Sequence, residues 1–393
     1  MRSSAYFRFV RMLRVFLILF LVGVVALFYP GKKHSLPKAS AAQLIGEAPL
    51  VGFPEDLDDE DPKNPDVEIS NGKVYVSWGT DKDGNNGKAR LAEKYFWGGP
   101  FTRVDVGKIQ GESTYFTTSI AADANGTLHY VWIENERTIK HRSRNLGGGW
   151  SEEHIVNSKQ KFPSSISLAA SQNDLFAAWR GPEGELQIAH SIDAGISWNT
   201  TQIGPKAYRG TPTFAVHGKD VYLAWTSSDF FIYLAKWNGT SFDAKKLFPD
   251  KIFGEPEIGE LPDSRLVMLS RINANPFYAE QQGDASWTRS DFFTAGGSTP
   301  QPALAVDTDG NVHIAFVGNF EGRRQVLYAI KRVGEDTFSD PVAVSKDDNN
   351  YKVNVSIDAE SFGSMARAYV AWETFYFENS TDEWPKHKIR AIS

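Results

Sequence analysis

Residues Ser191-Ile192-Asp193-Ala194-Gly195-Ile196-Ser197-Trp198 follow the pattern Ser-x-Asp-x-Gly-x-x-Trp, which predicts a tight turn between two strands. A short Asp side chain can accept hydrogen bonds from the N–H groups just ahead of it and hold such a turn closed. A glycine can take the positive φ that the turn requires, and the Trp can bury a large ring at the start of the next strand. The residues with a structural role in this turn are therefore Ser191, Asp193, Gly195 and Trp198.

A strand pattern that usually ends in an aromatic residue recurs seven times along the chain. Successive copies are 54, 47, 46, 45, 46 and 56 residues apart. A period of about 40–50 residues with strand patterning is typical of β-propellers, whose blades are four-stranded antiparallel sheets. The seven copies are Val74–Trp78, Leu128–Trp132, Leu175–Trp179, Val221–Trp225, Leu266–Ser270, Val312–Phe316 and Ala368–Trp372.

A second landmark follows the first in six of the repeats, where an aromatic residue ends a turn-like segment. In one of them, Ser143–Trp150 repeats the opening pattern with Asn145 in place of Asp. The position of this landmark predicts that the turn joins the third and fourth strands of each blade. The six aromatic residues are Phe101, Trp150, Trp198, Phe242, Trp287 and Phe338.

The seventh repeat is incomplete, because the chain ends after one more strand at Lys388–Ile392. Residues 44–53 have a strand-like sequence and could supply the missing outer strand. Pairing the two ends of the chain would remove the exposed sheet edge that an open blade presents. The sequence thus predicts an all-β, seven-bladed propeller over residues 44–393.

The opening turn and the repeats resemble the Asp-box, or BNR, repeats of the sialidase-like β-propeller superfamily. The resemblance covers about residues 44–393, and it makes six blades the alternative count, because the sialidases of that family have six. It implies that three Arg bind the substrate carboxylate, that a Tyr supported by a Glu is the nucleophile, and that an Asp is the acid/base. The family's Arg-Ile-Pro motif is absent from the first inner strand, Asn64–Ile69.

Three arginines are the candidates for binding an anionic group. Arg180 and Arg271 directly follow the recurring strand in the third and fifth repeats, and Arg209 enters the fourth. All three are expected on the face opposite to the Asp-box turns, where guanidinium groups could bind a carboxylate bidentately. Ion pairs with neighbouring acids are the alternative role. The candidate catalysts on the same face are Asp229, Glu255 and Tyr278.

The N-terminus predicts export of the propeller. Residues 1–14 form a basic end that is expected in the cytoplasm, and Val15–Tyr29 is an unbroken apolar run of 15 residues. A helix over 15–30 would be a transmembrane signal-anchor or a signal peptide cleaved at Ala39–Ala41, with 31–43 as a linker. The propeller is then membrane-anchored in a bacterial periplasm or at the cell surface, or it is secreted.

Composition excludes several classes of function. The chain has no Cys, which rules out disulfides, iron–sulfur clusters and cysteine nucleophiles. Beyond residue 40 there are 35 basic and 48 acidic residues, and a net charge of −13 argues against nucleic-acid binding. No metal or cofactor is expected. The acidic run Glu55–Asp61 is interpreted as a solvated charge run, with a divalent cation site as the alternative.

Two functions fit these observations. The first is a sialidase-like protein that recognises or hydrolyses glycans, an exo-sialidase if it is an enzyme, with the three arginines on an anionic sugar. The second is a non-catalytic scaffold that binds a protein partner at the membrane surface.

Overall fold

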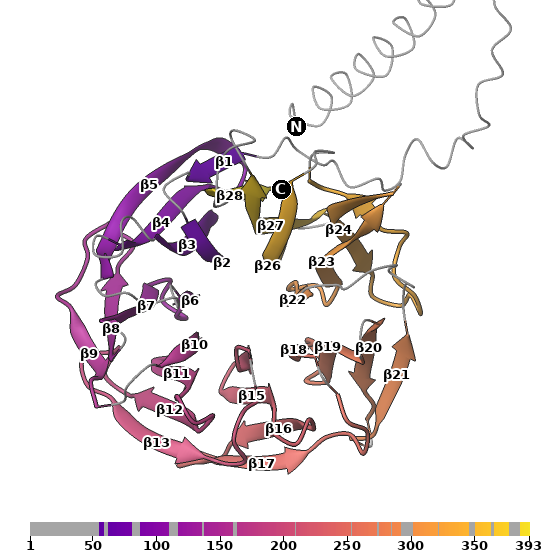
Figure 1. Cartoon of the computed structure of the whole chain (residues 1–393), viewed down its shortest axis with the longest axis horizontal. Coiled ribbons are helices and arrows are strands. Elements are labelled where there is room, and N and C mark those ends of the chain that lie inside the picture. Colours follow the sequence, from indigo (N-terminus) through magenta and orange to yellow (C-terminus); the bar gives the residue numbers. More distant parts are fainter. Residues whose placement is uncertain are drawn as a thin grey trace, which may run out of the picture. The chain divides into compact units, whose positions relative to one another are not determined.

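The alternating segments of the sequence form seven four-stranded antiparallel sheets, which are arranged as the blades of a propeller (Figure 1). The computed structural model describes residues 55–58, 62–80, 87–109, 117–135, 137–159, 163–208, 210–252, 254–272, 275–283, 285–291, 302–320, 322–345, 350–362, 365–376 and 386–393. The predicted N-terminal helix and linker lie outside these ranges. In the described ranges no helix is long and apolar enough to cross a membrane.

Each of the first six blades takes four consecutive strands, ordered from the central channel outward. Blade 1 contains β2 (Pro62–Ser70), β3 (Lys73–Thr80), β4 (Gly87–Tyr95) and β5 (Gly98–Ile109). Blade 2 contains β6 (Thr118–Ala122), β7 (Leu128–Glu134), β8 (Thr138–Arg144) and β9 (His154–Asn157). Blade 3 contains β10 (Ser164–Ser171), β11 (Asp174–Arg180), β12 (Leu186–Ser191) and β13 (Asn199–Ile203).

The next three blades repeat the same order. Blade 4 contains β14 (Thr213–His217), β15 (Asp220–Thr226), β16 (Ile232–Trp237) and β17 (Phe242–Lys246). Blade 5 contains β18 (Glu257–Glu260), β19 (Leu266–Ile272), β20 (Asn275–Gln281) and β21 (Trp287–Asp291). Blade 6 contains β22 (Ala303–Val306), β23 (Val312–Phe320), β24 (Arg323–Lys331) and β25 (Val342–Ala343).

Blade 7 joins the two ends of the described chain. It consists of β26 (Tyr351–Phe362), β27 (Met365–Tyr376), β28 (Lys386–Ile392) and, as its outer strand, β1 (Glu55–Asp58). The seven-bladed prediction is confirmed, and the six-bladed alternative is wrong. The closing strand differs in position from the predicted one: it is Glu55–Asp58, whereas residues 44–53 lie outside the described residues.

Two acids of the closing strand bond blade 1 and β28. A bulge follows Asp56 in the register of β1, and the Asp58 side chain is fully buried. Its carboxylate accepts hydrogen bonds from Trp78 Nε1 (2.6 Å), Arg90 Nη1 (2.6 Å) and Arg103 Nη1 (3.0 Å). Asp56 accepts one from Arg390 Nε (2.7 Å). The interpretation of the acidic run as solvated is therefore wrong for Asp58, whereas Asp56 is 48% exposed and residues 59–61 lie outside the described residues.

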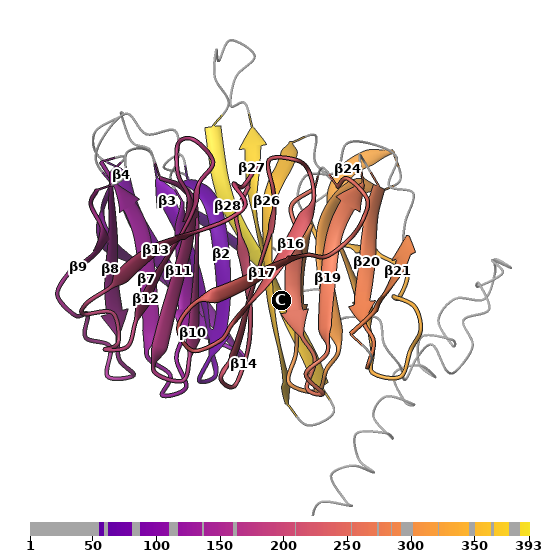
Figure 2. The ribbon, with the colours of Figure 1, turned by 90° about the horizontal axis from the view of Figure 1, so that it is seen from below.

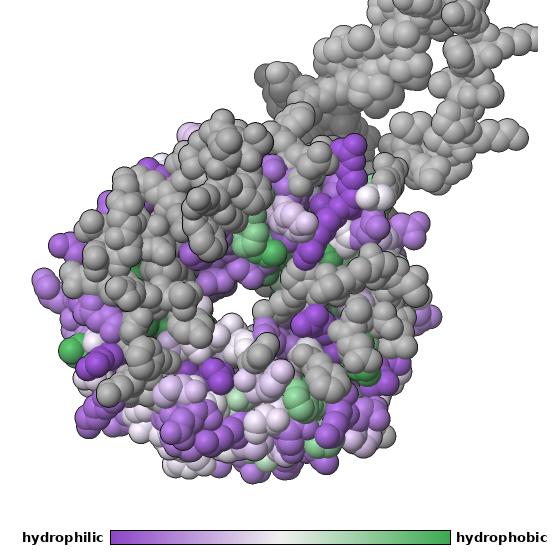
Figure 3. All heavy atoms as spheres, in the orientation of Figure 1, coloured by the Kyte–Doolittle hydropathy of each residue, from purple (hydrophilic) through white to green (hydrophobic). Residues whose placement is uncertain are grey.

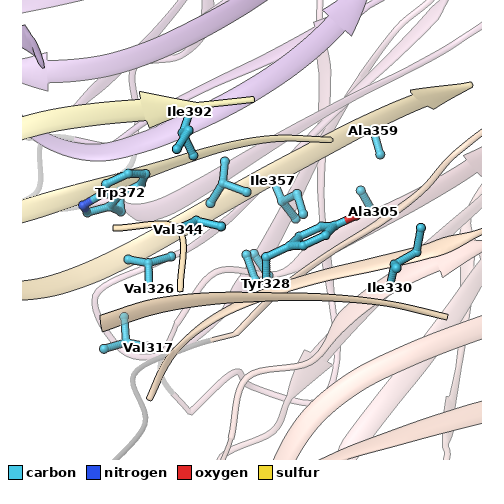
Figure 4. Packing of buried hydrophobic residues seen from close by; sticks show 13 residues of the cluster. Ala305, Val317, Val326, Tyr328, Ile330, Val344, Ile357, Ala359, Trp372 and Ile392 are labelled. Carbon is cyan, nitrogen blue, oxygen red and sulfur yellow. The ribbon is translucent and has the colours of Figure 1, made fainter. Parts of the chain in front are cut away.

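The hydrophobic core is divided into seven clusters, each including residues of two neighbouring blades. Figure 4 shows one of them, in which Val326 and Tyr328 of blade 6 pack with Ile357 and Trp372 of blade 7. The tryptophans that end the recurring strand are completely or almost completely buried, so the repeat pattern that predicts the blades also supplies their core. They are Trp78, Trp132, Trp179, Trp225 and Trp372.

Because antiparallel strands reverse direction at each connection, the connections fall on two faces (Figure 2). We call the face with the first-to-second and third-to-fourth strand connections the turn face, and the other the loop face. The opening turn of the sequence joins β12 to β13 on the turn face. Asp193 accepts hydrogen bonds from the Ser197 N–H (2.9 Å) and Oγ (2.6 Å), and Trp198 Nε1 donates to the Gly195 carbonyl (3.0 Å).

Candidate functional site

The predicted arginines belong to the loop-face ends of separate blades. Arg180 ends β11 in blade 3, and Arg271 lies one residue before the end of β19 in blade 5. Blade 4, which stands between them, has Thr226 at the corresponding strand end. Arg180 Nε is buried and has no hydrogen-bond partner within the described chain. Arg209 lies outside the described residues, so convergence of the three guanidinium groups stays a prediction.

Glu255 and Arg271 do come together beside blade 4. The Glu255 carboxylate accepts a hydrogen bond from the Thr211 backbone and interacts with the Arg271 guanidinium. A Cβ on Gly210 would stand 1.8 Å from Glu255 Cδ, so a larger residue at this position would force the carboxyl group to move. Burial raises the pKa of Glu255 to about 6, and Arg271 opposes that rise. This pair is the only part of the predicted site that the described residues assemble.

The other two predicted catalysts have structural partners. Tyr278 is 4% exposed and packs between blades 5 and 6, where its hydroxyl donates to Glu280 Oε2 (2.9 Å). Burial raises the pKa of Tyr278, which keeps its hydroxyl protonated. Tyr278 and Glu255 therefore lie on different sides of blade 5. Asp229 accepts a hydrogen bond from Ser227 within the connection between β15 and β16.

No group of three His, Asp or Glu side chains in the described ranges could hold a metal ion. His129 and His313 are completely buried at equivalent positions of β7 and β23. The His313 ring contacts the Tyr328 hydroxyl (2.8 Å) and Asp307 Oδ2 (3.1 Å). These histidines therefore belong to the packing of the blades.

The central channel is a hollow of about 300 Å³ between the inner strands, and its opening is visible in Figure 3. Its acids join neighbouring blades: the Ile69 N–H donates to Asp358 (2.6 Å), and the Ile120 N–H donates to Asp66 (3.0 Å). Burial raises the pKa of Asp66, and it raises that of Asp358 to about 7. Because these carboxyl groups bond backbone N–H groups, we assign them to the architecture of the ring.

A larger hollow, of about 670 Å³, lies between blades 4 and 5. We call it the blade 4/5 groove. Tyr222 and Leu234 contribute to it from blade 4, and Gln281 and Trp287 from blade 5. Both aromatic rings are only partly buried, so they can contact a ligand. A volume of this size is within the range of small-molecule sites in proteins.

The preceding interface, between blades 3 and 4, is closed by aromatic side chains at the same place. Phe176 stacks on His190 with ring centroids 4.6 Å apart, and it meets Trp237 at 5.2 Å and Phe242 at 5.8 Å. In the strand register, Phe176 is opposite His190, and Trp237 is opposite Phe242. Four rings therefore fill this position between the two blades.

The corresponding positions of the next interface explain why the groove is open. Tyr222 is opposite Lys236 in blade 4, and Gln281 is opposite Trp287 in blade 5. A lysine thus replaces the histidine of the closed interface, and a glutamine replaces its inner tryptophan. Long polar side chains do not fill the space that two rings would occupy, and the two remaining aromatic residues become the walls of the groove.

The groove is more basic than the rest of the propeller. Its lining includes Lys236, Lys245 and Lys246 but only one acid, Asp243. Lys236 Nζ lies 2.9 Å from the Asp220 carboxylate and 5.0 Å from the centre of the Tyr222 ring. Hydrogen bonds with Tyr222 and Asp220 raise the pKa of Lys236, so it carries a positive charge. The groove can therefore attract an anion although the whole propeller is acidic.

No protein-family model and no curated protein matches the chain. Among solved structures, it is similar to a catalytically inactive virginiamycin B lyase from Staphylococcus aureus, with a TM-score of 0.52 and 12% identity over 86% of this chain and 98% of that chain. It is also similar to the fucose-specific lectin of Aleuria aurantia, with a TM-score of 0.50 and 13% identity over 73% of this chain and 97% of that chain.

The NanB sialidase of Streptococcus pneumoniae aligns with a TM-score of 0.49 and 9% identity over 89% of this chain and 71% of that chain. Identities of this order show the propeller fold and nothing finer. A specific membership in the sialidase-like superfamily is therefore not confirmed, and the function has to be argued from the chain's own residues.

The blade 4/5 groove was not predicted from the sequence. A signal for it was present in the repeats, because aligning the blades puts Gln281 where blade 4 has Trp237. To recognise this replacement, the third strands must be aligned in the correct register. The turn before Trp287 departs from the repeat pattern, so the sequence alone does not define that register.

Proposed function

We propose that the propeller is a glycan-binding protein and that the blade 4/5 groove binds an acidic sugar. The observation that carries the proposal is the replacement of a closed aromatic interface by an open groove with Tyr222, Lys236, Gln281 and Trp287 at its walls. A groove of about 670 Å³ fits a few sugar residues.

The chemistry of the lining suits a carbohydrate. An aromatic ring such as Trp287 offers a flat apolar surface to the C–H face of a pyranose. The Gln281 amide can both donate to and accept from sugar hydroxyl groups. Because Lys236 is paired with Asp220, Lys245 and Lys246 against Asp243 leave a small excess of positive charge, which favours a glycan that carries a carboxylate or a sulfate. These three properties together distinguish a sugar site from a purely apolar ligand pocket.

We do not extend the proposal to hydrolysis. Most glycosidases need two carboxyl groups across the scissile bond, and Asp243 is the only acid among the described residues that line the groove. The Tyr nucleophile expected from the sialidase resemblance would be Tyr278, whose hydroxyl is bonded to Glu280 in a packed interface. The observations therefore support binding better than catalysis.

The setting of this function is also part of the proposal. The basic end and the apolar run Val15–Tyr29 support export of the propeller, either anchored in the membrane or released after cleavage. A glycan-binding protein outside the cytoplasm would meet envelope polysaccharides or the glycans of another cell.

A glycan array tests the proposal with four proteins: the wild type, Trp287→Ala, Gln281→Trp and Tyr351→Ala. Gln281→Trp restores the ring that closes the preceding interface, and Tyr351 is a 60% exposed aromatic residue that does not line the groove. We expect the wild type and Tyr351→Ala to bind the same acidic glycans. Both groove variants should lose that binding, while Gln281→Trp should melt at or above the wild-type temperature.

Two results would reject this function. Binding of acidic glycans by Gln281→Trp and Trp287→Ala at wild-type strength would place the site elsewhere. Binding of no glycan by the wild type on arrays of sialylated, uronic-acid-containing, sulfated and neutral glycans would favour a protein-binding scaffold instead.

A further inference from the structure

Large apolar side chains are exposed on the turn face. Eight of them are highly exposed among the described residues. Five of the eight lie in connections between a third and a fourth strand, and a sixth ends the third strand at such a connection. Single exposed apolar residues are ordinary, but a concentration in one kind of connection on one face marks an interaction surface. The six are Tyr95 (69%), Trp97 (56%), Leu146 (65%), Ile192 (71%), Ile196 (63%) and Val333 (65%).

Five of the six occupy three adjacent blades. Tyr95 ends β4 and Trp97 is in the turn that follows it in blade 1, Leu146 is in the turn of blade 2, and Ile192 and Ile196 are in that of blade 3. We call these five residues the apolar arc. The equivalent turns of blades 4 and 5, residues 238–241 and 282–286, expose no large apolar side chain in their described residues. Among the described turns, the exposed large apolar side chains are therefore concentrated in blades 1–3, and Val333 of blade 6 lies apart from them.

Cations accompany the aromatic residues of the arc. Lys73 Nζ lies 5.5 Å from the centre of the Tyr95 ring, and the Arg367 guanidinium lies 5.4 Å from that of Trp97. Aromatic rings beside Lys and Arg are typical of segments at the boundary between lipid tails and headgroups, where the rings enter the interface and the cations meet phosphates.

The chain enters the propeller beside this arc. β1 begins at Glu55 on the turn face, because it runs antiparallel to β28, whose C-terminal end is on that face. Lys94 Nζ, one residue from Tyr95, lies 2.8 Å from the Glu55 carboxylate. Only 25 residues separate Tyr29, the last of the apolar run, from Glu55. A linker of that length extends to at most about 80–90 Å, so an anchor formed by the apolar run would tether the propeller through the face on which β1 begins.

From these observations we propose that the apolar arc is a membrane-contact surface that seats the edge of blades 1–3 in the lipid interface. This inference does not depend on glycan binding, but it does rest on export of the propeller behind its N-terminal segment. The occupant is a lipid surface, since the arc consists of separate turn tips with flanking cations, and none of its five residues lines the central channel or the blade 4/5 groove.

Site-directed fluorescence tests the inference on the full-length chain in phospholipid vesicles. The chain has no Cys, so single cysteines can carry an environment-sensitive dye without background labelling. The test positions are Ile192→Cys and Leu146→Cys. The controls are Thr240→Cys, in the turn of blade 4, and Ile155→Cys, a 58% exposed residue on the outer strand of blade 2.

We expect blue-shifted emission at positions 192 and 146, and quenching of it by lipids that carry a nitroxide on the acyl chain. Positions 240 and 155 should keep the emission of a dye in water. Equal emission at all four positions would overturn the proposal. A blue shift at 192 and 146 that nitroxide lipids do not quench would also overturn it, because the arc would then face a second copy of the chain.

Discussion

Replacing Asp58 by Asn tests whether the ring is closed by buried charge. The Asp58 carboxylate is completely buried and accepts hydrogen bonds from Trp78, Arg90 and Arg103, which all belong to blade 1. Arg90 is itself only 3% exposed at its side chain. An amide at position 58 would leave that guanidinium without its buried counter-charge and would turn an N–H donor towards other donors.

The expected loss of stability follows from these contacts. Removing one partner of a buried ion pair costs about 3–5 kcal/mol. Arg90 Nε keeps a second bond to Asp105 (3.0 Å), whose side chain is 48% exposed, so we expect the lower end of that range, about 3 kcal/mol. In a domain of this size each kcal/mol lowers the melting temperature by about 2 °C, and the melting temperature should fall by roughly 6 °C.

Urea unfolding of Asp58→Asn, Asp56→Asn and the wild type measures the effect. Asp56 is the matched control, because it lies in the same strand and bonds Arg390 (2.7 Å) but is 48% exposed, and its loss should amount to less than about 1 kcal/mol. Equal midpoints for the two variants at an unchanged slope would refute the role of burial at this closure. A loss above about 2 kcal/mol for Asp58→Asn alone would support it.

Three further predictions concern single side chains. Burial raises the pKa of Glu260 to about 7, from 4.5 in the unfolded chain, and neither of its oxygens has a hydrogen-bond partner among the described residues. Between pH 4.5 and 7 the folded state therefore holds a proton that the unfolded state has lost, so the wild type should lose stability relative to Glu260→Gln as the pH rises through this range. Unfolding of both proteins at several pH values measures the difference in their stability, and a difference that does not change with pH would contradict the prediction. Gly195→Ala should lower the free energy of unfolding by roughly 3 kcal/mol, because φ is +88° and the new Cβ would stand 2.1 Å from the His141 ring. The control Gly239→Ala, with φ +99° and open space around the new Cβ, should lower it by about 1 kcal/mol. Similar shifts of the melting temperature for both variants would show that the contact with the His141 ring is unimportant. Tyr278→Phe should lower the free energy of unfolding by about 1 kcal/mol and leave glycan binding unchanged, and a loss of binding without a loss of stability would restore Tyr278 as a site residue.

The architecture was predictable because the same strand pattern occurs seven times in the sequence. A strand of alternating residues ending near a buried tryptophan, such as Trp132 or Trp179, indicates a blade even where one copy is degenerate. The partner of the last blade was harder to place. Asp58 is acidic and looks solvated in the sequence, and only the fold brings it to Arg90, 32 residues away, and to Trp78.

The candidate site was less predictable for a related reason. The repeat pattern predicts where along a strand a residue such as Tyr278 lies. It does not predict which of the two neighbouring blades the side chain faces. The groove depends on what four strands leave unfilled, and that depends on the register of Lys236 and Gln281 with their neighbours. A hollow is a property of packing, so it has no motif of its own.

The closing strand has a consequence for the order in which this molecule is made. β1 is among the first described segments to be synthesised and β28 is the last, and the bond from Arg390 to Asp56 spans 334 residues. Joining such distant segments is entropically costly, so closure comes late in folding. A chain that stops before β28 leaves unpaired strand edges in the last blade, which favour aggregation or degradation. Closure of the ring thus makes the stability of the whole propeller depend on synthesis of β28, whether or not a ligand is present.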